Sequence, residues 1–195
     1  MAEIVDQSQL LGGTGAGFGE FDGMRYRGQG FIPDIASLTA IEFDRNKGSY
    51  GIKIFLYAAD SDSIPTGGEI YSWEVANGDI TGNFQKFTLP VEQTLTIGNR
   101  YCFYIAPWDT SAHEYHDDYQ DADWKNANVY SDGKAIQYFG GWSVSDSGNL
   151  DMHFQTYGNE ATAGPAGVKT INDTVLSNIK SINDTLIGSV KTING

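Results

Sequence analysis

The sequence contains one cysteine, Cys102, so neither an intrachain disulfide framework nor a zinc site built on cysteines is available to it. Because Cys102 lies in the apolar run RYCFYIA, we expect it to be a small buried residue. No apolar run approaches the roughly 20 residues of a membrane-spanning helix. The first residues, MAEIVDQSQLLGGTG, lack a basic end followed by an apolar stretch, so we expect no secretory signal.

Positive charge is also scarce, because 12 Lys and Arg face 25 Asp and Glu and leave a net charge of −13. Residues 160–195 are neutral, with three Lys against Glu160, Asp173 and Asp184. The whole acidic excess therefore lies before residue 160. Such a surface repels phosphate backbones and anionic lipid, so we expect neither a nucleic-acid nor a membrane partner.

Catalytic motifs are missing as well. The sequence has no Gly-x-Ser-x-Gly elbow, no His-Glu-x-x-His and no cysteine nucleophile with a suitable local context. The stretch GGTGAGFG has the glycines of a phosphate loop, but no strand precedes it and no Lys-Ser/Thr follows. Pairs of carboxylates occur on any acidic surface, and one loop does not define glycosidase geometry. We therefore expect that the protein is not an enzyme.

What the sequence does contain is a series of short β-type runs separated by turn clusters such as DSDSIPTGG and NGDITGN. In LDMHFQTYG, apolar and polar residues alternate with the period of a half-buried antiparallel strand, with Leu150, Met152, Phe154 and Thr156 on one face. Asp151, His153 and Gln155 occupy the other face. No amphipathic stretch of helical length occurs. The predicted fold is therefore all-β, an antiparallel β-sandwich or jelly roll.

The composition predicts four regions. Residues 1–20 are small, glycine-rich and poorly patterned, which indicates a flexible N-terminal arm or docking arm. Residues 21–158 form the predicted sandwich, and residues 159–167 form a linker of small residues. Residues 168–195 repeat an 11-residue phrase, which begins at Val168, Ile179 and Val190.

The repeat has one apolar stripe, whose steps of three and four residues match an 11-residue helical repeat. Two other interpretations remain open: short helices broken at each Asn-Asp, or a short strand plus a turn in each unit. In all three, a segment this small cannot bury its stripe alone, so we expect self-association or docking onto a partner, with folding back onto the β domain as the alternative. The predicted assembly residues are Val168, Ile171, Val175, Ile179, Ile182, Leu186, Val190 and Ile193.

A long loop follows Pro107 and has six carboxylates and no Lys or Arg between Asp109 and Asp123. Two interpretations remain open, a solvated acidic loop and a structural Ca²⁺ site, because Ca²⁺ prefers six to eight oxygen ligands. A zinc or nickel site at His113 and His116 would need a third ligand that the local sequence does not offer. No other cofactor is expected. The candidate metal ligands are Asp117, Asp118, Asp121 and Asp123.

The same loop carries aromatic side chains that would suit a sugar-stacking platform, with nearby Asp and Asn to bind hydroxyl groups. The candidate glycan contacts are Trp108, Tyr115, Tyr119 and Trp124. The alternative is that Trp108 and Trp124 anchor the loop against the edge of the sandwich, with Trp73 and Trp142 partly buried.

The terminal array SNIKSINDT…SVKTING resembles short repeats at the ends of bacteriophage virion proteins, which usually carry Asn-Gly at each break. This chain has Asn-Gly only at 194–195 and Asn-Asp at 172–173 and 183–184. The β region resembles a jelly-roll module of phage structural proteins and extracellular bacterial proteins, similar to carbohydrate-binding modules. The matching elements are Gln29, the Asp62 to Gly67 turn, Gly98 to Tyr101, and Asp151 to Gly158.

These resemblances imply a virion structural protein, either a capsid decoration or a head or tail fibre component. The partners so implied are further copies of the chain, with a trimer the commonest arrangement, other virion proteins, and a host-surface glycan. The implied location is the virion surface, after synthesis in the host cytoplasm. The alternative function is a carbohydrate-binding module of a bacterial surface or secreted protein.

Overall fold

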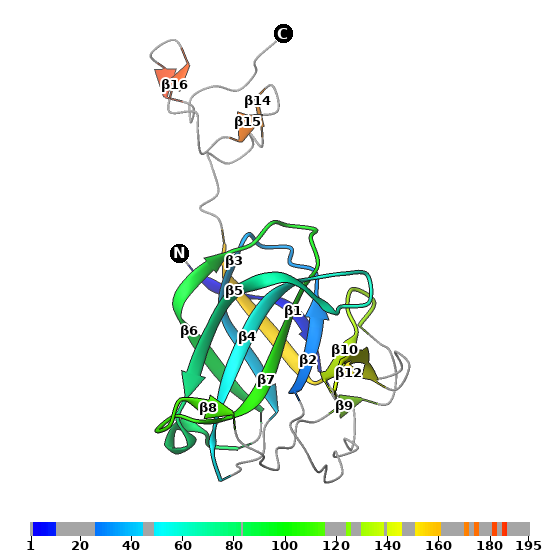
Figure 1. The fold of residues 1–195 in the computed structure, drawn as a ribbon. Helices are drawn as coiled ribbons and strands as arrows, with labels where there is room; N and C mark the ends of the chain where they lie inside the picture. The colour runs from blue at the N-terminus through cyan, green and yellow to red at the C-terminus, as the bar shows by residue number, and fades with distance from the viewer. Residues whose placement is uncertain are drawn as a thin grey trace. The chain divides into compact units, whose positions relative to one another are not determined.

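A computed structural model of the chain divides into two compact units, Ala2–Asn159 and Glu160–Gly195 (Figure 1). The structure describes residues 2–10, 26–44, 49–82, 84–115, 124–125, 130–138, 140–145 and 151–160, together with 170–171, 174–175, 181–182 and 185–186. Among these residues, no helix is both long and apolar enough to cross a membrane.

The first unit consists of two antiparallel sheets packed as a sandwich, which confirms the predicted all-β fold (Figure 1). The four-stranded sheet has the order β1 (Glu3–Gln9), β13 (Phe154–Asn159), β3 (Ser37–Asp44) and β6 (Phe84–Thr94). The seven-stranded sheet has the order β11 (Trp142–Val144), β10 (Ala135–Tyr138), β2 (Tyr26–Phe31), β7 (Tyr101–Asp109), β4 (Gly51–Ala59) and β5 (Pro65–Val75), with β8 (Glu114–Tyr115) paired to the end of β7. A short ladder joins β9 (Trp124–Lys125) to β12 (Asp151–Met152), and the 3₁₀ helix η1 spans Asn77–Asp79.

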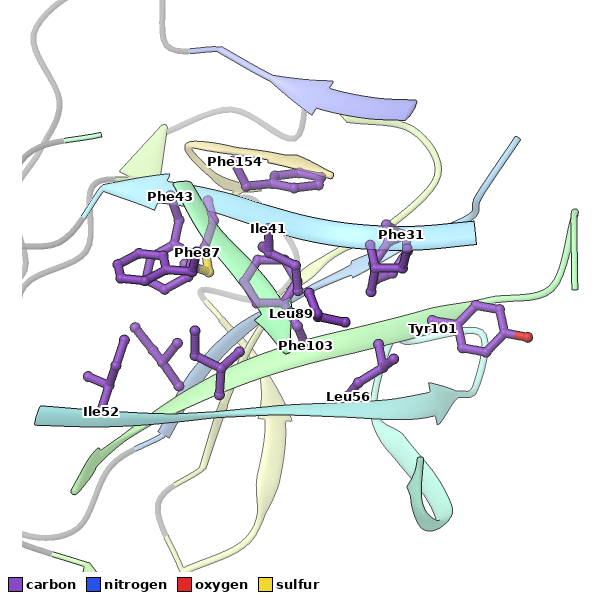
Figure 2. Packing of buried hydrophobic residues seen from close by; sticks show 14 of the residues in the cluster. Phe31, Ile41, Phe43, Ile52, Leu56, Phe87, Leu89, Tyr101, Phe103 and Phe154 are labelled. Carbon is purple, nitrogen blue, oxygen red and sulfur yellow. The ribbon is translucent and has the colours of Figure 1, made fainter. Parts of the chain in front are cut away.

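Aromatic rings from both sheets meet in the core between them (Figure 2). Phe103 of β7 lies 5.9 Å, centroid to centroid, from both Phe43 and Phe154 of the opposite sheet, and 6.5 Å from Phe31. All four side chains are fully buried. The alternation predicted for the last strand is present, because Phe154 and Thr156 point inward while Gln155 and Tyr157 are half-buried. Strand alternation thus places one apolar layer between the sheets.

Two of the notebook-free expectations about single residues can be compared with the structure at this point: Cys102 is buried, as predicted, and its burial raises the pKa of the thiol. Asp151, in contrast, was predicted on the outer face of its strand and is fully buried. Its carboxylate accepts hydrogen bonds from Gln29 Nε2 at 3.3 Å and from the Tyr130 backbone N–H at 2.9 Å. The polar partners, which only the folded chain brings together, explain this exception to the alternation.

The prediction of a flexible arm over residues 1–20 is wrong for Glu3–Gln9, which form β1 and pair with β13. The inward side chains of β1 include two glutamines, Gln7 and Gln9, rather than apolar residues. Gln7 is held by hydrogen bonds, since its Oε1 accepts from the Tyr130 hydroxyl at 3.0 Å and its Nε2 donates to Asp34. A strand with polar residues on its buried side has no apolar period, so the sequence pattern did not reveal it.

The last strand of the sandwich extends to Asn159, one residue beyond the predicted limit of 158. Asn159 pairs with Glu3 in β1, and its backbone N–H donates to Ser37 Oγ at 3.1 Å. Its side-chain amide donates to Glu92 at 2.8 Å. Asn159 therefore belongs to the folded sandwich.

The second unit contains two strand pairs, β14 (Thr170–Ile171) with β15 (Thr174–Val175), and β16 (Ser181–Ile182) with β17 (Thr185–Leu186). Each pair is antiparallel, and the second pair repeats the first 11 residues later. These eight residues follow the strand-plus-turn interpretation and not the helical one, consistent with their β-branched side chains and a two-residue connection. Of the other predicted assembly residues, Val168, Ile179, Val190 and Ile193 lie outside the described residues.

Candidate functional site

The outer side of the seven-stranded sheet carries a second group of aromatic side chains, separate from the core. Strand alternation produces it: Phe103 and Ile105 of β7 point into the core, whereas Tyr104 and Trp108 point outward. The same alternation in β4 turns Phe55 outward. We name this surface the aromatic face, and it comprises Tyr26, Phe55, Tyr57, Tyr104, Trp108, Tyr115, Tyr138 and Trp142.

Tyr104 lies at the centre of the aromatic face. Its ring centroid is 4.6 Å from Phe55 and 4.7 Å from Trp142, and rings from neighbouring strands continue the contact through Tyr26 at 5.6 Å and Tyr57 at 5.7 Å. Offset and tilted pairs at these separations are the arrangements that aromatic rings prefer. Because the rings support one another from several strands, the aromatic face is held in one arrangement.

Tyr115 of β8 is the most exposed ring of the aromatic face, at 41%. It lies 5.3 Å from Tyr26 and meets the edge of Trp108 at 4.9 Å. Trp108 is only 6% exposed, and its buried indole N–H has no hydrogen-bond partner among the described residues. Trp108 therefore supports Tyr115 from below, and its own ring is not an open stacking surface.

The tyrosine hydroxyl groups of the aromatic face are neutral at ordinary pH. Burial raises the pKa of Tyr26 to about 12, with a further contribution from the nearby Tyr115 and Tyr138. Burial also raises the pKa of Tyr104, whose hydroxyl shares a hydrogen bond with that of Tyr57. The face thus offers flat rings with uncharged hydroxyl groups that donate and accept hydrogen bonds.

Two charged groups border the aromatic face. Lys53 Nζ lies 4.5 Å from the ring centroid of Trp108 and 5.3 Å from that of Phe55. His113 Nδ1 lies 3.0 Å from a carboxylate oxygen of Glu74. The Glu74 carboxylate is the contact that the structure gives His113, and His116, its partner in the predicted zinc or nickel site, lies outside the described residues.

The structure brings two of the four predicted glycan contacts together, Trp108 and Tyr115, and buries the first of them. The side chains of Tyr119 and Trp124 lie outside the described residues, as do the candidate metal ligands Asp117, Asp118, Asp121 and Asp123. Sequence reasoning missed the rings that strands other than β7 and β8 contribute, which are Tyr26, Phe55, Tyr57, Tyr138 and Trp142. The outward positions of those strands carried the signal, since aromatic residues there are more than solvent exposure requires.

No family model matches the chain, and no curated protein matches it. Among solved structures, the chain is similar to a clostridial cysteine protease, Cwp84, after propeptide cleavage, with 11% sequence identity and a TM-score of 0.48. The match covers 80% of this chain and 39% of the protease chain, so this chain spans less than half the length of that protein. At this level of similarity, the match supports no conclusion about function.

Proposed function

We propose that this chain is a non-enzymatic structural protein of a bacteriophage particle, a capsid decoration or a head or tail fibre component, that displays the β-sandwich on the particle surface. The observation that carries the proposal is the separate C-terminal unit, in which two strand pairs recur at a spacing of 11 residues. Two-residue strands are too short to be stable alone in water, so such a unit needs copies of itself or a partner to complete it.

The acidic charge of the chain and the resemblance of its repeat to the ends of phage virion proteins add support. The partners in this proposal are further copies of the chain, most simply as a trimer, and neighbouring virion proteins. The aromatic face is the surface proposed to contact host glycans, since flat rings with neutral hydroxyl groups stack on sugar rings and bind their hydroxyl groups.

Removing the repeat tests this proposal. We expect light scattering to show an oligomer for the full chain and a monomer for a chain that ends at Asn159, because the truncation leaves every strand of the sandwich intact. The far-ultraviolet circular dichroism of the two chains should retain the same β signal, which controls for folding. The same mass per particle in both samples would contradict a role of the repeat in assembly.

A second candidate, a carbohydrate-binding module of a bacterial surface or secreted protein, is favoured by the aromatic face itself. This function predicts a monomer with and without residues 160–195.

For glycan contact, we expect that Trp142→Ala lowers the affinity for a glycan selected on an array by about tenfold, or about 1.4 kcal/mol. Trp142 is half-buried on the short strand β11, so the substitution removes a stacking ring with little cost to the core. Ile70→Ala, at an exposed site away from the aromatic face, is the matched control. Absence of binding to every glycan on the array would count against both glycan roles.

A further inference from the structure

A cleft of about 270 Å³ lies where the edge strands of the two sheets, β5 and β6, come together. Trp73 and Val75 of β5 and Phe87 of β6 supply its apolar walls, and Asp79, Gln85 and Thr88 supply polar groups. None of these residues belongs to the aromatic face. We call this hollow the β5–β6 cleft.

The β5–β6 cleft contains a hydrogen-bond donor without an acceptor. Trp73 is only 6% exposed, and its indole Nε1–H has no partner among the described residues. A buried N–H that stays unpaired costs about 1–3 kcal/mol. An oxygen atom that enters the cleft lined by this ring would remove that cost.

The polar groups at the rim are arranged for an uncharged guest. Gln85 is already engaged, since its Oε1 accepts from the Thr81 backbone N–H at 2.8 Å and its Nε2 donates to the Asp79 carbonyl oxygen at 2.8 Å. Lys86 is paired with Glu3 and lies over the ring of Tyr157, 3.8 Å from its centroid. With this cation engaged, the acidic side chain of Asp79 dominates the rim, and an anionic ligand would be repelled.

We propose that the β5–β6 cleft binds one neutral hexose unit of a glycan. A ring or hydroxyl oxygen accepts from Trp73 Nε1, hydroxyl groups donate to the Asp79 carboxylate, and the C–H face of the sugar packs on Phe87. The volume is near the lower end of ordinary ligand pockets, which suits a single sugar ring. An added peptide strand fits less well, because Pro90 in the cleft wall lacks the N–H that a continuous ladder along β6 needs.

This inference rests on the proposed glycan contact and adds a second site to it. The test is saturation-transfer NMR on the full chain with four probes, the methyl glycosides of glucose, galactose, mannose and N-acetylglucosamine. We expect binding of at least one probe, and at least a tenfold weaker signal for Thr88→Arg, whose long side chain fills the cleft from an exposed position. Thr94→Arg, also exposed on β6 but outside the cleft, is the matched control and should bind as the parent does.

Trp73→Phe, which removes the N–H while keeping an aromatic ring, should weaken binding in the same direction, and Thr88→Arg provides the test if that core variant does not fold. Unchanged binding by Thr88→Arg, or no transfer to any of the four probes, overturns the cleft proposal. Loss of binding by Trp142→Ala alone overturns the cleft but leaves glycan contact at the aromatic face standing. The assembly role is decided separately by light scattering.

Discussion

Replacing Phe154 with alanine is expected to lower the free energy of unfolding by about 3–5 kcal/mol, the usual cost of removing a large aromatic side chain from a core. Phe154 is fully buried and packs against Phe103 of the opposite sheet and against the edge of Tyr130 at 5.2 Å (Figure 2). The cavity left by the substitution would therefore lie between the two sheets. Urea unfolding of the full chain, followed by tryptophan fluorescence, measures the effect.

Val91→Ala is the control for this prediction, because Val91 is 59% exposed on the edge strand β6. A substitution at such a surface site should change the free energy of unfolding by no more than about 0.5 kcal/mol. If the two variants unfolded at the same urea concentration, the sandwich core described above would be wrong.

Replacing Gly28 with alanine is expected to destabilise the protein by about 1–3 kcal/mol or more, the cost of forcing atoms into a packed region. A Cβ at Gly28 would lie 2.1 Å from the backbone oxygen of Phe103 and 2.7 Å from the Cβ of Tyr104. The nearest atom belongs to the backbone of β7, so relief requires β2 and β7 to separate. The near-ultraviolet circular dichroism of the aromatic face should weaken along with stability.

The matched control is Gly68→Ala, since a Cβ at Gly68 meets no atom within 4 Å. Its backbone is not in the left-handed region, so alanine should leave stability unchanged or raise it by up to about 1 kcal/mol. Equal destabilisation by both substitutions would show that the close approach of β2 and β7 is not what Gly28 serves.

The sandwich could be predicted because its core obeys a simple period, as Phe154 and Thr156 show. β1 could not, because the residues that it buries are glutamines, and their hydrogen-bond partners Tyr130 and Asp34 lie far away in the sequence. An apolar pattern records the transfer of side chains from water, and it is silent where hydrogen bonds replace water.

The candidate site was half predicted for a related reason. Trp108 and Tyr115 are close in sequence, so a loop hypothesis found them, whereas Tyr26 and Tyr104 become neighbours only through the strand order of the sheet. In the repeat, a spacing of 11 residues suits three helical turns and also a hairpin of fixed length, so the spacing alone did not distinguish them.

The pairing of Glu3 with Asn159 brings the two ends of the sandwich side by side on adjacent strands, about 5 Å apart as in any antiparallel pair. A module with neighbouring entry and exit points can be spliced into a surface loop of a carrier protein without stretching either junction. The same geometry would allow the chain to be permuted, with new ends opened elsewhere and the old ones joined by a short bridge. The sandwich is in this sense a portable cassette.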